Sequence, residues 1–234
     1  MSENLNQDYL KFSKEIGKSS KSLFKIDGII EPNFKKHHKS IYALALIITK
    51  LKKEEKDENK LVFLAEILSD LLTVTKLSFL GFESPALIVL RRAIENFYNH
   101  IYYTDHPIEY EHLNLGKNEY TPIDKLKLYF DTHPIFAGSE DGNLKEFNQS
   151  LFNEYQQLCK VVHSKGKDSM NLSKCLKDLT DEFEINDFLK QLINIELFFV
   201  YLIYKFHNVL KYTATEKTII TAIVPTNKRN HLHE

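Results

Sequence analysis

Apolar residues recur every three or four positions along most of this chain, which is the spacing of one face of an α-helix. Between residues 34 and 53, Ile41, Leu44, Ala45, Ile48 and Leu51 follow this spacing. A similar stripe runs from Lys60 to Leu80 and stops at Gly81, a residue favoured just past helix ends. The pattern therefore predicts two long helices, separated by the charged segment 52–60.

A third strong pattern follows after a short link. Ser84 is expected to cap this helix and Pro85 to be its first residue, because these residue types favour those two positions. The helix should end before Pro107, after about residue 105. Because the link is short, we expect this helix to pack antiparallel to the one before it.

The remaining segments carry weaker patterns. We expect a polar helix at 4–24, short helices at 108–114 and 122–132, a surface loop at 134–143, helices at 144–163 and 186–212, an extended piece at 218–225 and a loose tail. Only 7 glycines and 6 prolines interrupt the chain, which favours long helices over a turn-rich β fold. The fold predicted is all-α, a single-domain antiparallel helical bundle. Its parts would be an N-terminal helical extension at 1–59, a core at 60–212 and a tail at 213–234.

Charge and cysteine usage narrow the setting. The formal net charge is -1, which argues against broad coating of nucleic acid or of a membrane surface. The 2 cysteines form no C-x-x-C pair, so neither a disulfide framework nor a zinc site is expected. The most apolar run, 192–204, is shorter than the roughly 20 residues of a membrane span and contains Glu196. With no apolar signal core at the N-terminus, we expect a cytoplasmic protein with no membrane contact.

Several short motifs do not support a site. The E-x-x-H spacing of Glu109 and His112 occurs once, whereas di-iron bundles need it twice. His37 and His38 lie about 100° apart on a helix and cannot easily share a metal ion. Cys159 lies four residues before His163, but a cysteine on a helix stripe is more often a small apolar residue than a nucleophile. We therefore expect no metal and no cofactor.

Polar residues stand out in the otherwise apolar helix 85–105. They are Arg91, Arg92, Glu95, Asn96, Asn99 and His100. Arg92, Glu95, Asn96 and Asn99 are spaced i, i+3, i+4, i+7 and form one stripe. A charge in a core helix is costly unless it is paired or faces water. The stripe indicates either an arginine–glutamate pair that locks two helices or a cleft that binds an anionic substrate, and the spacing favours the pair.

A second group surrounds the end of helix 144–163. His163 lies at the C-terminal end, where the helix dipole favours a protonated imidazole. Lys160, Lys165 and Lys167 add positive charge around it. This combination suits a phosphate-bearing ligand. The alternative is a histidine that merely caps the helix.

Together, the motifs L-R-R-x-I-E-N at 90–96 and Y-x-x-L-x-x-x-V-H-S at 155–164 resemble a prokaryotic branch of the HEPN-like all-α superfamily, over roughly residues 60–212. The resemblance implies a HEPN-like bundle with additional N-terminal helices. Active members of that superfamily are metal-independent ribonucleases of toxin–antitoxin, abortive-infection and CRISPR-linked defence systems. In them a dimer brings R-x(4–6)-H motifs to a shared cleft. The arginine stabilises phosphate charge, and the histidine assists proton transfer at a ribose 2′-hydroxyl.

This chain departs from that motif, because seven residues separate Arg92 from His100 and place them about 80° apart on a helix. The resemblance therefore implies a site built from Arg92 and His163 across two helices, oriented by Glu95 and Asn96. The expected substrate contacts are Arg91, Asn96, Asn99, Lys160 and Lys165.

Three functions stay open at this point. The first is a defence or toxin–antitoxin ribonuclease that binds RNA or another phosphate-bearing ligand. The second is a non-catalytic helical module that dimerises or docks a protein partner encoded nearby. The third is a regulator that binds a small molecule or nucleotide in the same cleft. A homodimer is expected, because the helix at 187–212 carries more apolar residues than one buried stripe needs.

Overall fold

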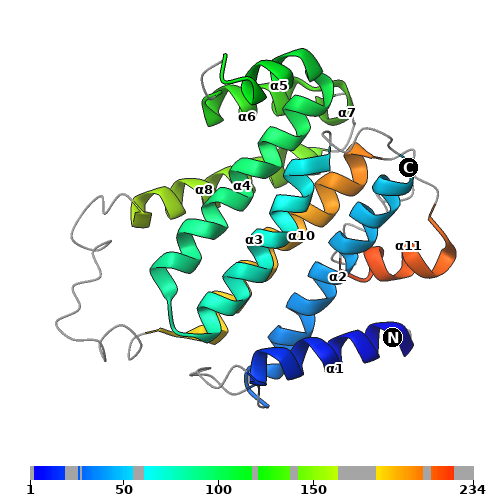
Figure 1. The fold of residues 1–234 in the computed structure, drawn as a ribbon, viewed down its shortest axis with the longest axis vertical. Helices are drawn as coiled ribbons and strands as arrows, with labels where there is room; N and C mark the ends of the chain where they lie inside the picture. Colours follow the sequence, from blue (N-terminus) through cyan, green and yellow to red (C-terminus); the bar gives the residue numbers. More distant parts are fainter. Residues whose placement is uncertain are drawn as a thin grey trace.

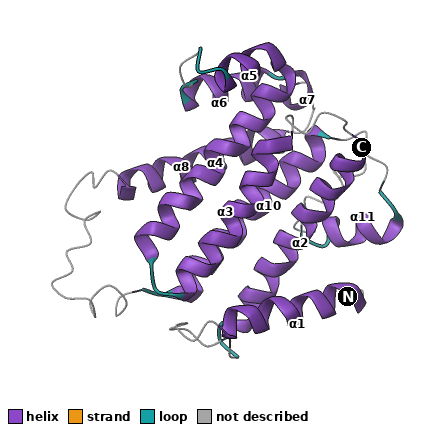
Figure 2. Cartoon of the chain, viewed as in Figure 1, coloured by secondary structure: helices purple, strands orange, loops and turns teal. Residues whose placement is uncertain are grey.

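A computed structural model of the chain describes residues 3–18, 26, 28–54, 61–117, 121–137, 142–162, 183–207 and 212–223. Within these ranges every regular element is a helix, as Figure 2 shows. The prediction of an all-α fold is therefore confirmed. Of the helices described, none combines the length and the apolar character needed to cross a membrane.

Figure 1 shows how the helices are arranged along the chain. They are α1 (Glu3–Lys18), α2 (Glu31–Glu54), α3 (Val62–Phe79), α4 (Glu83–Asp105), α5 (Pro107–Asn114), α6 (Ile123–Thr132), α7 (Pro134–Ala137), α8 (Gly142–Val162), α10 (Ile185–Phe206) and α11 (Ala214–Thr221). The long helices α2, α3, α4, α8 and α10 build the bundle, and the short helices α5, α6 and α7 gather at one end of α4 (Figure 1).

The turn between α3 and α4 depends on a glycine. Gly81 has a φ of 78°, in the left-handed region that other residues avoid. The turn closes when the backbone N–H of Phe82 donates to the carbonyl of Leu77 (2.9 Å). Because the chain has already reversed at this point, α4 begins at Glu83 with Phe82 at its N-cap. The expectation that Ser84 caps this helix was therefore wrong, since Ser84 already lies inside its first turn.

Side-chain pairs give the direction in which α3 and α4 pack. Phe63 near the start of α3 stacks on Tyr103 near the end of α4, with ring centroids 5.6 Å apart. Further along, Asp70 of α3 pairs with Arg92 of α4. The two helices are therefore antiparallel, as the short link predicted, and Figure 1 shows them joined at one end.

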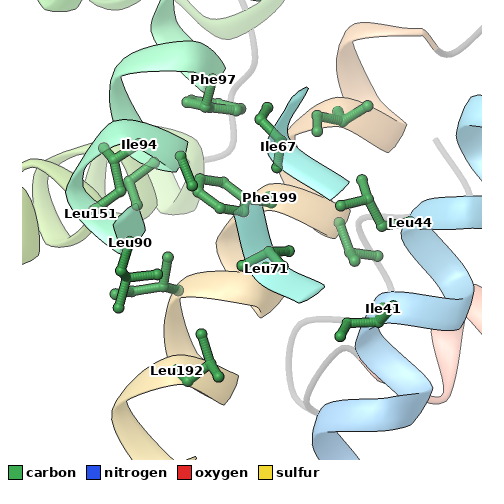
Figure 3. Packing of buried hydrophobic residues seen from close by; sticks show 14 of the residues in the cluster. Ile41, Leu44, Ile67, Leu71, Leu90, Ile94, Phe97, Leu151, Leu192 and Phe199 are labelled. Carbon is green, nitrogen blue, oxygen red and sulfur yellow. The ribbon is translucent and has the colours of Figure 1, made fainter. Parts of the chain in front are cut away.

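One hydrophobic cluster joins the bundle helices. Figure 3 shows part of it, with Ile41 and Leu44 from α2, Ile67 and Leu71 from α3, Leu90, Ile94 and Phe97 from α4, Leu151 from α8, and Leu192 and Phe199 from α10. Phe97 and Phe199 stack with ring centroids 5.5 Å apart. Tyr9 of α1 and Ile220 of α11 belong to the same cluster. The N-terminal helices thus share the core of the helices that follow them.

Most of α10 is covered by its own chain. Its buried residues are Ile185, Phe188, Leu189, Leu192, Ile195, Glu196, Phe199, Val200, Tyr201, Leu202, Ile203 and Phe206. Leu197 and Phe198 are partly buried and pack against the same core. The apolar excess of α10 is therefore accounted for within one chain, and a homodimer needs support from another surface.

Two segments differ from the prediction made for them. Residues 218–225 were expected to be extended, but Thr218 to Thr221 lie in α11. That helix starts at a capping box, in which Thr213 and Glu216 bond each other's backbone N–H groups. The loop expected at 134–143 begins with the short helix α7, because Phe136 is buried and stacks on Phe130 (3.9 Å between centroids).

Candidate functional site

A polar cluster links α3 and α4 around the buried carboxylate of Asp70. Arg92 donates to both Asp70 oxygens, from Nε to Oδ2 at 3.2 Å and from an Nη atom to Oδ1. Asn96 Nδ2 donates to the same Oδ2 (3.2 Å) and to Glu66 Oε2 (3.3 Å). The Asp70 side chain is 1% exposed, whereas that of Arg92 is 57% exposed. The guanidinium is therefore fixed on one edge and open to solvent on the other.

Charge around Arg92 is not positive overall. The hydrogen bond from Arg92 to Asp70, more than any other cause, raises the pKa of the guanidinium, which stays charged. Asp70 neutralises that charge directly, and Glu66 adds a second carboxylate through Asn96. With two carboxylates around one guanidinium, the cluster attracts a phosphate less than an unpaired arginine would.

A second cluster links α4 to α8. Arg91 donates to Glu95 Oε1 (2.7 Å) and to the Tyr155 hydroxyl (3.5 Å), and Tyr155 donates to the same Glu95 oxygen (3.0 Å). The guanidinium also lies over the Tyr155 ring, 5.6 Å from its centroid. Burial raises the pKa of the Tyr155 phenol, which stays protonated and can donate. This cluster thus joins one acid, one guanidinium and one phenol, with Cys159 of α8 beside the phenol.

The residues that the sequence spacing placed in one stripe therefore face two different helices in the structure. Arg92 and Asn96 face α3 through Asp70, while Glu95 faces α8 together with Arg91. Asn99 is buried at 8% exposure. The sequence had not led us to expect hydrogen bonds between this stripe and Asp70 or Tyr155.

The predicted residues at the end of α8 are described only in part. Lys160 is exposed and donates to Gln157 Oε1 (3.3 Å). His163 and Lys165 lie outside the described residues, so the proposed meeting of Arg92 and His163 stays a prediction. Of the two arginines of α4, Arg91 is the one that contacts the described part of α8, through the Tyr155 hydroxyl.

Sequence reasoning missed a third polar group, buried where α2, α3 and α10 meet. His37 Nδ1 lies 2.7 Å from Glu196 Oε1, and His37 Nε2 lies 2.8 Å from Thr75 Oγ1. The His37 and Glu196 side chains are 0% and 1% exposed. Glu196 was the residue that could have predicted this buried group, because an acidic side chain in such an apolar run requires a buried partner.

Hydrogen-bond counting shows where the protons of this group lie. The single Thr75 proton goes to the Leu71 carbonyl (2.7 Å), so Thr75 accepts from His37 Nε2. One further proton must then lie between His37 Nδ1 and Glu196. Burial raises the pKa of Glu196, although His37 lowers it in part. His37 Nδ1 and Glu196 Oε1 therefore share one proton in a bond that is buried from water.

The order hydroxyl, imidazole, carboxyl is also that of hydrolytic triads. Here, however, Thr75 is fully buried and its proton is committed to its own helix, so a substrate cannot reach it. Among the described residues, no group of three or more His, Cys, Asp or Glu side chains is placed to hold a metal ion. The buried group is best understood as a polar junction that fixes three helices.

The chemistry of the site therefore rests on α4, whose two arginines serve different neighbours. The resemblance to the HEPN-like superfamily stays an expectation from the motifs at 90–96 and 155–164, of which His163 and Ser164 lie outside the described residues. A comparison of the chain with models of known families finds no match, and comparisons with curated proteins and with solved structures find none either.

Proposed function

We propose that this chain is a HEPN-like helical module of a prokaryotic defence or toxin–antitoxin system, and that it works by pairing with a second copy of itself through α4. The observation that carries this proposal is an exposed stripe on α4, formed by Pro85, Ile88 and Arg92 at i, i+3, i+7. Ile88 is 51% exposed, and Phe82, just before the helix, is 47% exposed. Apolar side chains beside an arginine are typical of the centre of protein interfaces.

Charge supports pairing between like copies. In a two-fold dimer the same patch meets itself, so the Arg92 residues of two copies can approach each other. Two unpaired guanidinium groups would repel, but each Arg92 is already neutralised by Asp70. The stripe can therefore lose its water without leaving an unpaired guanidinium at the interface.

The mass of the protein in solution tests this proposal. Light scattering at micromolar concentration should give twice the chain mass for the parent protein and the chain mass for Ile88→Glu, because a carboxylate would be buried in the interface. Leu128→Glu is the matched control, since Leu128 is 64% exposed on α6, away from the stripe. It should stay dimeric. A monomeric parent, or equal masses for the two variants, would contradict the proposal.

A second candidate is the metal-independent ribonuclease implied by the resemblance. Its support is the Arg92 guanidinium, which is held in place by a buried carboxylate yet 57% exposed. A fixed, accessible arginine is what phosphate recognition uses. The carboxylates of Asp70 and Glu66 weaken that attraction, so we rank this candidate second. In it, dimerisation would bring two Arg92 residues to one cleft, and His163 would transfer the proton.

RNA cleavage and growth inhibition on expression distinguish the two candidates. A ribonuclease should lose both in His163→Ala while its mass stays dimeric. A binding module should show no cleavage in the parent or in the variant. Cleavage that persists in His163→Ala would exclude the proposed catalytic role of that residue.

A further inference from the structure

Helix α1 is attached to the bundle through a small set of aromatic contacts. Tyr9 and Phe12 of α1 lie against Phe34 and His38 of α2, with ring centroids 5.2 to 6.1 Å apart. Leu5 and Tyr9 are buried, whereas most other described side chains of α1 are exposed. In Figure 1, α1 lies beside the first part of α2 and apart from α4 and α8. The attachment of α1 therefore depends on few side chains.

His38 is the polar centre of this attachment. Its side chain is 2% exposed, and its Nε2 lies 2.9 Å from Asp8 Oδ2 of α1. An ionised carboxylate only accepts, so Nε2 carries the proton and the neutral ring has a bare Nδ1. Nδ1 is buried and has no hydrogen-bond partner among the described residues. The neutral ring fits this environment, because a bare nitrogen lone pair needs no acceptor.

Protonation of His38 changes that balance. It would place an N–H group at Nδ1, buried and without an acceptor, and a positive charge in an apolar environment. Asp8 could compensate, but its side chain is 51% exposed, so water screens its attraction. In agreement with this balance, the pKa of His38 is lowered, with burial as the largest cause and a smaller contribution from His37, although the hydrogen bond and charge of Asp8 raise it in part.

Among the residues that the structure describes, few titratable groups lie around His38. They are Asp8 and Tyr9 of α1 and His37 and Tyr42 of α2, with Lys35 over the Tyr9 ring and Glu196 of α10 against His37. His37 is bonded on both ring nitrogens and cannot serve as an acceptor for His38. Of this set, only Asp8 can balance an imidazolium at His38 directly.

We propose that α1 is an acid-sensitive latch, which is docked on α2 while His38 is neutral and is released when the buried ring takes up a proton. The direction of the pH dependence follows from the pKa of the His38 ring in the docked and in the released state. In the released state its pKa returns to the ordinary value of 6.5, above that of the docked state. Docking is therefore complete above pH 6.5 and is lost as the pH falls through the docked pKa. Between pH 6.5 and the docked pKa the ratio of docked to released α1 falls by up to about tenfold per pH unit, and below the docked pKa it changes no further.

A single tryptophan can report the latch, because the chain contains none. Phe12→Trp places it against Phe34 and His38, where release moves the indole into water. Its emission should shift reversibly to longer wavelength between about pH 8 and about pH 5, the titration range of imidazole. The midpoint should lie below pH 6.5, the ordinary imidazole value. Far-ultraviolet circular dichroism should keep most of its helical signal. A constant emission, or loss of the whole helical signal at the same pH, would overturn the proposal.

Two variants in the tryptophan background identify the proton. His38→Gln keeps an N–H for Asp8 and cannot titrate, so its emission should not change with pH. His112→Gln, at an exposed position on α5, should behave like the parent. The same transition in His38→Gln would overturn the proposal.

If α1 is already released at pH 8 in His38→Gln, NMR of the imidazole nitrogens in the parent protein tests the proposal instead. The proposal requires the Nε2–H tautomer when docked, with protonation and loss of α1 contacts at one midpoint. A protonated His38 with α1 still docked would refute it.

Discussion

Asp70 is the residue on which the α3–α4 contact depends. Its carboxylate is almost completely buried and accepts hydrogen bonds from Arg92 and Asn96. When a buried carboxylate loses one hydrogen-bond donor, the free-energy cost of removing it from water remains, but the hydrogen bond that offset part of that cost is gone. The effect of a substitution in this cluster on stability therefore depends mainly on whether Asp70 keeps its hydrogen-bond donors, and less on the exposed Arg92 itself.

Replacing Arg92 by Ala should lower the free energy of unfolding by about 1–3 kcal/mol, the cost of leaving a buried charged group short of a partner. Urea denaturation measures this value. The double variant Asp70→Asn/Arg92→Gln should recover part of the loss, because no charge is then stranded. A double variant less stable than Arg92→Ala would show that the ion pair itself, and not the stranded charge, supplies the stability.

The buried Glu196 should make stability depend on pH. Burial raises its pKa above the ordinary value of 4.5, so the folded carboxyl keeps a proton that the unfolded one has lost. This contribution is fully present below pH 4.5 and is lost as the pH rises through the raised pKa. Its slope is at most about 1.4 kcal/mol per pH unit.

Glu196→Gln should remove that slope, because an amide mimics the neutral carboxyl. The free energy of unfolding, measured across the pH range for both proteins, provides the comparison. Glu146→Gln, at an exposed position on α8, should keep the parent slope. Parallel profiles for Glu196→Gln and the parent would mean that the carboxyl is ionised in the fold.

Sequence spacing anticipated part of the polar cluster around Asp70 and could not anticipate the rest. The i, i+3, i+4 pattern placed Arg92 and Asn96 on one side of a core helix, and they do share Asp70. The same pattern included Glu95, which turns to α8 instead. A single helix pattern cannot show which neighbour each side chain meets, because that depends on how helices pack across the bundle.

At the scale of elements, helix ends were harder to predict than helices. The periodic stripes of α2, α3 and α8 were anticipated because burying one face of a helix requires them. The start of α4 was misplaced by the turn at Gly81, and α11 was missed altogether. The sequence T-A-T-E at 213–216 has the spacing of a capping box and was the signal to use there.

The capping box gives α11 a testable weak point. Thr213→Ala removes the side-chain acceptor for the Glu216 backbone N–H (3.2 Å) and should cost about 1 kcal/mol. Amide hydrogen exchange should accelerate in α11 and stay unchanged in α3 and α4. Thr221→Ala, at the other end of α11, should have little effect. Equal exchange in the two variants would mean that packing against α2 holds α11 without the cap.

At the scale of the whole molecule, α10 joins helices that are far apart in the sequence, because it packs against α2 and α8 and stacks Phe199 on Phe97 of α4. Phe199→Ala should lower the free energy of unfolding by about 3–5 kcal/mol, because it opens a cavity beside Phe97. Phe198→Ala is the matched control, since Phe198 is only partly buried. It should cost clearly less in the same denaturation experiment. Equal losses would contradict the inference that the buried Phe199 contributes more to the core than Phe198 does.

The adjacent arginines of α4 have a consequence for how uniquely the bundle folds. A helix that is apolar on most sides has little to fix its rotation about its own axis, because many rotated positions bury similar area. Consecutive helical residues point about 100° apart. Arg91 and Arg92 use this angle to reach Tyr155 on one side and Asp70 on the other. Any other rotation would strand at least one of these groups, so the Arg92–Asp70 ion pair and the contact of Arg91 with Tyr155 select one orientation of α4 from several that the core alone would accept.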